Sequence, residues 1–238
     1  MKGLGTIVNV AGVIIGSLIG LLMRGGISKR FQDIFMHALG LSSMFIGVAG
    51  TVKGLLYISG GALETRNSML MIISMVAGAA VGEAINIENL LEQMGNSLKE
   101  KLKADSSKFT EGFVTVSLII CVGAMAVVGS LQDGLTGDAS MLYAKSALDT
   151  VLAMIFASAM GVGVIFSALP LAVYQGGITL FATVIEPILT QEAISNLSFV
   201  GSLLIFGVGV NLCFGKKFKV GNMLPALIFA ILLSFVKS

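Results

Sequence analysis

The sequence predicts an all-α protein, a polytopic bundle of transmembrane helices with about eight spans. Only 12% of its 238 residues are charged, whereas soluble domains carry about 25% charged residues. The mean hydropathy is +0.96. Apolar runs of the ~20 residues needed to cross a bilayer recur along the whole chain.

Each expected span is an apolar run bounded by charged, glycine-rich or proline-containing segments. The first run follows Lys2 closely and exceeds the apolar core of a signal peptide, so we expect it to be retained as a span. The sixth run is short and starts inside an irregular segment. In chain order, the spans are expected near residues 5–23, 35–57, 68–86, 112–131, 147–168, 174–190, 197–214 and 220–236.

Positive charge is concentrated in the first, third and seventh loops. Because such basic loops stay in the cytoplasm, a chain with eight spans would have both termini outside. The outer loop at 132–146 carries Asp133 and Asp138, which predict either an acidic mouth that attracts cations or a solvated acidic loop. The basic residues are Arg24, Lys29, Arg30, Lys99, Lys101, Lys103, Lys108, Lys216, Lys217 and Lys219.

A weak internal repeat divides the chain, with shared membrane composition as the alternative explanation. Gly-Ser-Leu occurs at 16–18 and at 129–131, each time before a loop and a span with a late glycine pair. A repeated unit of three spans has to be inserted upside down, as in many secondary transporters. The expected domains are a first repeat at 1–87, a cytoplasmic amphipathic helix and linker at 88–110, a second repeat at 111–190 and a C-terminal two-span hairpin at 191–238.

Two stripes of residues repeat at helical spacing. Gly12, Gly16 and Gly20 share one face of the first span, which predicts close backbone contact with another helix. The second stripe is apolar and lies on the expected helix at 88–104. It predicts either a surface helix in the membrane interface or a docking site for a partner. Its members are Leu90, Met94, Leu98 and Leu102.

A few polar side chains interrupt the apolar spans, where such groups are costly and face the protein interior or water. Asn9 and Asn211 predict either hydrogen bonds between helices or the lining of a path. Asp149 predicts either an ion pair with Lys145, four residues earlier, or a role in a path. These side chains are the first candidates for a functional site.

The segment SALPLAVYQGGITLF, residues 167–181, is the most irregular part of an apolar run. Pro170 removes a backbone donor and disturbs the preceding turn. Gly176 and Gly177 lower helix stability again. We therefore expect a helix break at 167–177, either a short tight loop or a re-entrant break.

A break at this depth would expose polar groups to a cavity, because non-helical backbone is not tolerated in contact with lipid. Ser167, Tyr174 and Gln175 would supply those groups. Asn222 and Pro225 predict a second break at the start of the last span. Two glycine- or proline-broken segments of this kind indicate a transport site.

Four stretches together carry a resemblance that covers nearly the whole chain: GTIVNVAGVIIGSLIG, CVGAMAVVGSLQDGLTGD, FSALPLAVYQGGITL and VGNMLPAL. They are similar to the bacterial membrane family called domain of unknown function 554, the YqgA-like proteins. The resemblance implies a multi-pass protein of the bacterial inner (plasma) membrane, from an uncharacterised family whose members are often described as transporters. It implies no substrate and no catalytic residues.

We expect a transport protein, either a carrier or a channel, for a small solute or ion. The alternatives are a scaffold or regulator that acts through the 88–104 helix, and an intramembrane enzyme that uses Asp133 and Asp149. No nucleophile–base pair is evident in the sequence, so an enzyme is not expected. The residues expected to line the path are Asn9, Asp133, Asp149, Ser167, Pro170, Tyr174, Gln175, Gly176, Gly177, Asn211, Asn222 and Pro225.

The expected partners follow from the same composition. The chain is embedded in the lipid bilayer, and its glycine-striped faces predict a homo-oligomer. Nucleic acid is not expected, because no basic patch with interleaved aromatic residues occurs. The two cysteines and the single histidine have no metal-ligand spacing, so neither a metal site nor a cofactor is expected.

Overall fold

The computed structural model describes residues 2–24, 29–103, 108–121, 124–187 and 189–235. The chain is mainly helical, as predicted, and divides into two compact units. Unit 1 comprises Met1–Ala38, Asn89–Cys121 and Met125–Glu186, and unit 2 comprises Leu39–Glu88, Val122–Ala124 and Pro187–Ser238. The units are interleaved along the chain, and the four predicted domains stay a prediction. The inverted repeat stays a prediction.

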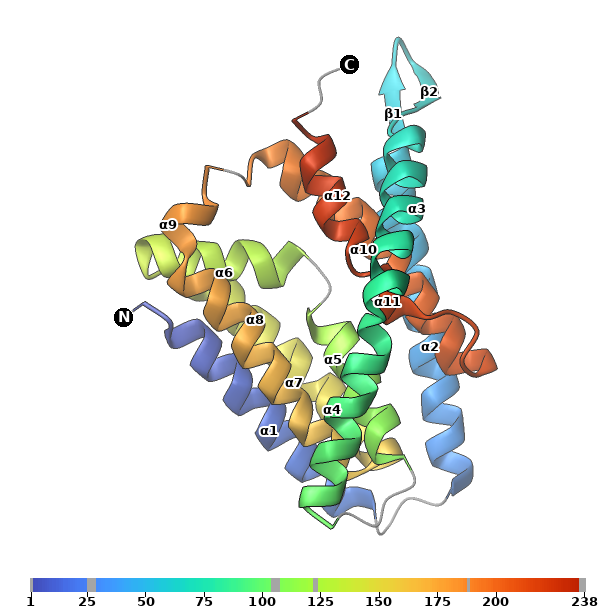
Figure 1. Ribbon diagram of the computed structural model, residues 1–238, viewed down its shortest axis with the longest axis vertical. Coiled ribbons are helices and arrows are strands. Elements are labelled where there is room, and N and C mark those ends of the chain that lie inside the picture. The colour runs from blue at the N-terminus through green and yellow to red at the C-terminus, as the bar shows by residue number, and fades with distance from the viewer. Residues whose placement is uncertain (1, 25–28, 104–107, 122–123, 188, 236–238) are drawn as a thin grey trace. The chain divides into compact units, whose positions relative to one another are not determined.

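Unit 1 contains long apolar helices and the predicted amphipathic helix. In Figure 1, α1, α7 and α8 lie side by side within it, and α1 contacts both other helices. The elements of this unit are α1 (Leu4–Arg24), the first part of α2 (Lys29–Leu55), most of α4 (Ile87–Lys101), α5 (Phe109–Cys121), α6 (Ala124–Thr136), α7 (Ser140–Met160), the 3-10 helix η1 (Val162–Ser167), α8 (Ala168–Leu180) and α9 (Ala182–Ile185).

The glycine stripe of α1 packs against α7, which confirms the predicted close contact. A Cβ atom added at Gly16 would collide with the backbone oxygen of Thr150, and one added at Gly20 would collide with that of Met154. Lipid provides no hydrophobic drive between helices, so close backbone packing of this kind holds them together. α1 and α7 make the most extensive helix–helix contact of the molecule.

The helix break in unit 1 lies earlier than predicted. Helix α7 ends at Met160 and is followed by Gly161, whose φ of 93° and ψ of −158° suit glycine alone. The 3-10 helix η1 follows, and α8 then runs without interruption from Ala168 to Leu180. The predicted break at 167–177 is therefore wrong in position. Pro170 lies in the first turn of α8, where the missing N–H costs little.

Unit 2 is also helical, and its helices approach one another at glycines. Gly78 of α3 packs on Ala226, and Gly82 packs on the backbone of Asn222. On α2, Gly47 lies against Ser202 and Phe206 of α10. The unit contains the rest of α2, the strands β1 (Leu56–Ser59) and β2 (Ala62–Thr65), α3 (Ser68–Ile85), α10 (Gln191–Phe214), α11 (Val220–Met223) and α12 (Ala226–Leu233).

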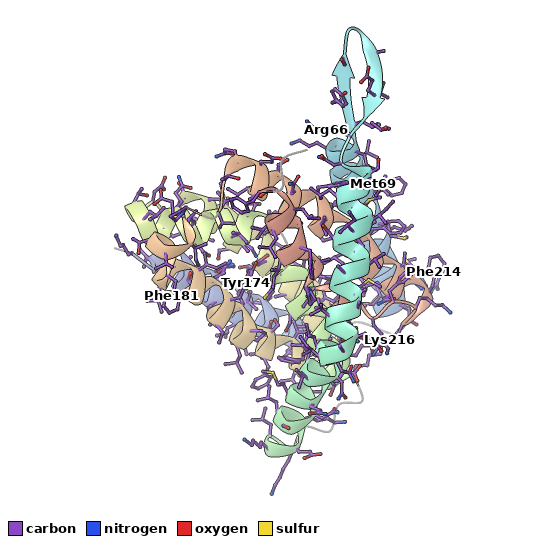
Figure 2. All side chains as sticks on the ribbon, turned by 45° about the horizontal axis from the view of Figure 1, so that its top comes forward. Arg66, Met69, Tyr174, Phe181, Phe214 and Lys216 are labelled. Atoms are coloured by element: carbon purple, nitrogen blue, oxygen red, sulfur yellow. The ribbon has the colours of Figure 1, made fainter. Side chains whose placement is uncertain are left out.

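The β1–β2 hairpin is absent from the all-α expectation. Its two strands pair antiparallel around Gly60 and Gly61, whose φ values of 57° and 82° are typical of a type I′ turn. Tyr57 donates a hydrogen bond of 2.6 Å to Glu64 across the strands, and the Arg66 guanidinium lies 5.8 Å from the Tyr57 ring centroid. Figure 2 shows Arg66 at the foot of this hairpin.

Six helices of the described chain are long and apolar enough to cross a membrane. A seventh span results if α5 and α6, which meet at an angle of 62°, count as one broken span. The predicted eighth span is shorter than expected, because Pro225 separates α11 from α12 and the pair covers only Val220–Leu233. The chain is therefore polytopic and helical, with six or seven long apolar helices and the shorter α11–α12 pair, and the number of eight spans stays a prediction.

Candidate functional site

The candidate site is a cluster of buried polar side chains contributed by three helices of unit 1. Asn9 of α1 is completely buried. Its Nδ2 donates one hydrogen bond of 3.0 Å to Asp149 Oδ2 on α7 and one of 3.2 Å to Gln175 Oε1 on α8. Gln175 is completely buried as well, and Asp149 is 6% exposed. Three of the residues predicted to line a path therefore meet in one place.

Lys145 completes the cluster with a second, opposite charge. Its ammonium group forms an ion pair with Asp149, one turn further along α7, which confirms the pairing that the sequence indicated as one alternative. The same ammonium donates a hydrogen bond of 3.0 Å to the backbone oxygen of Ile120. Ile120 lies at the end of α5, where carbonyl groups have no partner within the helix. Both charges are thus buried, paired and hydrogen-bonded.

Two atoms of this cluster have no hydrogen-bond partner: Asn9 Oδ1 and Gln175 Nε2. The orientation of both amides follows from Asp149, because the carboxylate needs a donor from Asn9 and the second N–H of Asn9 needs an acceptor from Gln175. In this arrangement, the acceptor Asn9 Oδ1 and the donor Gln175 Nε2 are therefore left without partners. Such buried, unpaired groups cost about 1–3 kcal/mol each. The arrangement is suited to hold a polar molecule.

A cavity of about 420 Å³ opens where α1 begins and α6 and α8 end. Thr6 Oγ1 and Thr179 Oγ1 lie 3.4 Å apart in its wall, and Thr179 donates a hydrogen bond of 3.1 Å to the backbone oxygen of Ser130. Gly176 also lines the cavity. Its wall therefore combines hydroxyl groups, a glycine and apolar side chains.

Thr6 and Thr179 were absent from the sequence-based set, although a helical signal could have found them. Thr6 lies three residues before Asn9 on α1, and Thr179 lies four residues after Gln175 on α8. Residues at these spacings share one helix face. A polar stripe thus leads on both helices from the cavity to the buried cluster.

Asp133 has a structural role that the sequence did not reveal. It is completely buried, and its two carboxylate oxygens accept hydrogen bonds from the backbone N–H groups of Gly3 at 3.1 Å and Gly5 at 3.0 Å. These amides belong to the start of α1, which has donors without partners and a partial positive charge. Asp133 therefore caps α1 from α6. It does not form the exposed acidic mouth that one interpretation of the sequence favoured.

Asp138 is exposed and caps the next helix. Its carboxylate accepts hydrogen bonds from the Ser140 hydroxyl and from the Ser140 backbone N–H at 3.0 Å, at the start of α7. These hydrogen bonds stabilise the charged form and lower the pKa of Asp138. The second acidic residue of this loop is therefore also engaged with a helix start.

The other residues predicted from the 167–177 segment do not join the cluster by a hydrogen bond. Ser167 is buried, but its hydroxyl donates to the Val164 backbone oxygen at 2.7 Å within η1. Tyr174 is partly buried on α8, where Figure 2 labels it. A Cβ atom added at Gly177 would find no atom within 4 Å. Continuous helix explains the difference, because it points successive side chains in different directions.

In unit 2, Asn211 stabilises a loop. Its Nδ2 donates to the Phe218 backbone oxygen at 2.7 Å, and its Oδ1 accepts from the N–H groups of Lys217 and Phe218 at 2.8 and 2.9 Å. These three hydrogen bonds join the Asn211 amide to the connection between α10 and α11. Asn211 is therefore occupied by the local fold.

Asn222 is the centre of a second polar cluster, in which every amide and carboxylate atom has a partner. Asn222 Nδ2 donates to Glu83 at 2.6 Å, and Asn222 Oδ1 accepts from the Glu88 backbone N–H at 2.7 Å. Glu88 pairs with Lys216 at 2.7 Å and accepts from the Gly221 N–H at 3.0 Å, while Glu83 pairs with Lys219 at 2.6 Å. This cluster fixes the short helix α11 to the α3–α4 junction. Pro225 then separates α11 from α12.

The sequence model of a family described as "Protein of unknown function (DUF554)" matches residues 4–235. The chain is 32% identical to the "Uncharacterized membrane protein YdfK" of Bacillus subtilis, over 98% of this chain and 96% of that protein. It is 30% identical to the "Uncharacterized protein YqgA" of Escherichia coli, over 97% of this chain and 96% of that protein. No solved structure matches it. The apolar helices and the membrane-protein relative support a multi-pass membrane protein. The resemblance expected from the sequence is thus confirmed, and the chain belongs to the DUF554 family.

Proposed function

We propose that the protein is a membrane transport protein, either a carrier or a channel, for a small solute or ion, and that unit 1 contains its path. One observation carries the proposal. Asn9 Oδ1 and Gln175 Nε2 are buried without partners beside the Lys145–Asp149 ion pair. A cluster that served packing alone would be expected to pair these atoms.

The depth of the cluster supports a transport role. Asn9 lies five residues after the start of α1 and Asp149 nine residues after the start of α7, which is about 8 and 14 Å into these helices at 1.5 Å per residue. With α1 and α7 crossing the bilayer as proposed, the cluster lies inside the hydrocarbon core of about 30 Å. Ionisable groups at such depth are expensive and usually mark an ion or solute pathway.

The packing of the same helices supports movement. The α1–α7 contact is formed by glycines and small side chains, with backbone against backbone. Glycine faces of this kind let two helix backbones approach closely, and we propose that α1 and α7 move against each other along this face during transport. The predicted inverted repeat, if present, would provide the second orientation that a carrier needs.

Transport is tested by reconstituting the purified protein on solid-supported membranes. Jumps of protons, alkali cations, common anions, amino acids and small amides are applied, and electroneutral uptake is followed in parallel with labelled solutes in liposomes. We expect a current or uptake that Asp149→Asn and Gln175→Ala abolish. Gln93→Ala is the matched control, because Gln93 is an exposed amide on α4. Folded protein that moves none of these solutes would contradict the proposal.

Location and orientation belong to the same proposal. Residence in the bacterial inner membrane with both termini outside would put the lysines at 99–108 and 216–219 in the cytoplasm. It would also make the cavity beside α1 an outer one. Reporter fusions at the two termini and after residue 103 test this arrangement. Termini on the cytoplasmic side would reverse the direction in which the path opens.

A scaffold or regulator acting through α4 is the second candidate. The observation in its favour is that Leu90 and Met94 of the amphipathic helix are 48% and 49% exposed. In a bilayer, such a stripe also suits the membrane interface. The variant Leu90→Ser/Met94→Ser separates the two functions. If the protein is a transporter, this variant retains transport in liposomes. If the protein is a scaffold, no transport is measured, and the variant stays stable but loses the effect that the protein has in cells.

A further inference from the structure

The cavity beside α1 and α8 raises the question of what approaches the Asn9–Gln175 pair. Thr6 and Thr179, which line the cavity, are one turn from Asn9 and Gln175 on the same helices. No covalent chemistry is evident there. The cavity lining ends at these two threonines, and the buried amides lie one turn further along the same helix faces, which gives a short polar route from the cavity wall to them.

Gly176 is the first sign that this space is kept open. Glycine in a helix interior costs about 0.5–1 kcal/mol relative to alanine. At Gly12, Gly16 and Gly20 of α1, the cost is balanced by close packing with α7. At Gly176, an added Cβ atom would find no atom within 4 Å. No packing contact therefore requires glycine at this position, but its small size widens the cavity.

The charged groups near this polar route determine which molecules can enter it and bind at the amides. Lys145 and Asp149 neutralise each other, and Asp133 is neutralised by the positive end of α1. Among the described lining residues, the exposed Lys2 alone is charged. A charged ligand would therefore lose its hydration at the cluster without gaining an opposite free charge, which is costly.

The two unpaired atoms determine the hydrogen bonds that a ligand must make. Asn9 Oδ1 needs a donor, and Gln175 Nε2 needs an acceptor. A hydroxyl group offers both on one oxygen atom, and a primary amide offers both on two neighbouring atoms of one planar group. We infer that the cavity is the water-filled entrance to a binding site for a small uncharged molecule with an amide-like donor and acceptor. The inference rests on the proposed function, since it names the class of solute that the path would carry.

The entrance is tested by cysteine labelling of the full-length protein in nanodiscs. In a background without Cys121 and Cys213, Gly176→Cys and Thr179→Cys are compared with Val173→Cys. Val173 is on the same helix but 76% exposed on its outer face, where lipid would cover it. We expect a membrane-impermeant thiol reagent to label the cavity positions at least ~10 times faster, because only a hydrated thiol ionises to the reactive thiolate. Equal rates at all three positions would overturn the inference.

The ligand class is tested by protection with three molecules of the same shape: acetamide, acetate and acetamidinium, which differ in charge. Acetamide is expected to slow labelling of Gly176→Cys by about twofold once it occupies half of the sites. Acetate and acetamidinium should leave the rate unchanged. Gln175→Leu, which removes the free donor, should abolish protection while labelling continues. Protection by a charged probe, or no protection by acetamide, would overturn the inference.

These measurements need no movement of solute across the membrane. Protection by acetamide without any uptake in liposomes would leave the binding site standing and contradict the transport proposal. Uptake of charged solutes without protection by acetamide would contradict the ligand class and leave transport standing. The two failures are therefore distinguishable.

Discussion

Each of the two units contains a cluster of polar side chains, and the clusters differ in how completely they are paired. In unit 2, every amide and carboxylate atom of Glu83, Glu88 and Asn222 has a partner. In unit 1, Asn9 Oδ1 and Gln175 Nε2 have none, although both residues are completely buried. A cluster in which every polar atom has a partner stabilises the fold. A cluster with an unpaired donor and an unpaired acceptor can bind a ligand that pairs with them.

The difference also follows from the position of each cluster. The unit 2 cluster gathers at helix ends, where Glu88 accepts from the start of α11 and the lysines lie in the connecting loop. Free backbone groups and exposed side chains supply partners there. The unit 1 cluster lies in the interior of three helices, whose backbone groups are already bonded. Apart from the Ile120 backbone oxygen, which accepts from Lys145, its side chains pair with each other, and one donor and one acceptor remain without a partner.

The largest expected effect comes from breaking the buried ion pair of unit 1. Asp149→Leu leaves the Lys145 ammonium buried without a counter-charge and should destabilise the protein by about 3–5 kcal/mol. The double variant Lys145→Met/Asp149→Leu removes both charges and should recover most of that loss, while transport stays abolished. Chemical unfolding in mild detergent measures both. A double variant as unstable as the single one would contradict this account of the pair.

The next prediction tests which glycines of unit 1 allow close helix packing and which ones leave open space beside their helix. Gly16→Ala forces a methyl group into the Thr150 backbone and should cost ~3 kcal/mol, at the upper end for overpacking because a backbone atom cannot move aside. Gly177→Ala is the control, since the added methyl group meets no atom and should stabilise α8 by ~0.5–1 kcal/mol. Thermal unfolding in nanodiscs measures both. Equal losses would show that α8 is packed where we describe open space.

A smaller effect is expected from the saturated cluster of unit 2. Asn222→Leu leaves the buried Glu88 N–H without its acceptor and should cost ~2 kcal/mol. Because this cluster is structural, the transport rate per folded molecule should be unchanged. Unfolding curves and uptake assays on the same preparations measure both quantities. A variant that folds normally but no longer transports would place the path in unit 2.

The smallest effect concerns the exposed hairpin of unit 2. The hydrogen bond from Tyr57 to Glu64 raises the pKa of Tyr57 above its ordinary value of about 10, since it stabilises the neutral phenol. The contribution to stability is therefore present below that value and is lost as the pH rises through the raised pKa. Glu64→Ala should return the Tyr57 pKa toward 10. Ultraviolet titration, with Tyr57→Phe to identify the signal, measures the shift. An unchanged titration would contradict the cross-strand hydrogen bond.

Several features of the molecule follow from local sequence, and these were predicted. Six of the eight predicted apolar runs form helices long enough to span a membrane, and the fourth, bent between α5 and α6, makes a seventh. The α1 glycine stripe packs against α7, and the helix expected at 88–104 occurs at Ile87–Lys101. Each of these depends on the spacing of residue types within one helix, which the sequence states directly.

Other features required the tertiary structure. Asn9 donates hydrogen bonds to Asp149 and Gln175, which are 140 and 166 residues away in the sequence. No local sequence pattern predicts contacts between residues so far apart. Asp133 was predicted to belong to an outer loop, either as an acidic mouth or as a solvated acidic residue, but it caps α1 because folding brings the two free amides of Gly3 and Gly5 to it. The helix break lies at Gly161 and not at 167–177, because proline is tolerated in the first turn of α8.

The sequence by itself thus determined which side chains would be expensive inside the membrane: Asn9, Asp149, Gln175, Asn211 and Asn222. Burial cost belongs to the residue and its apolar neighbours, so it can be predicted from the chain. Only the tertiary structure decided which of these groups would find partners. That depends on which helices pack together, and it separates Asn211 and Asn222, whose amide atoms are paired, from Asn9 and Gln175, which each keep one unpaired atom.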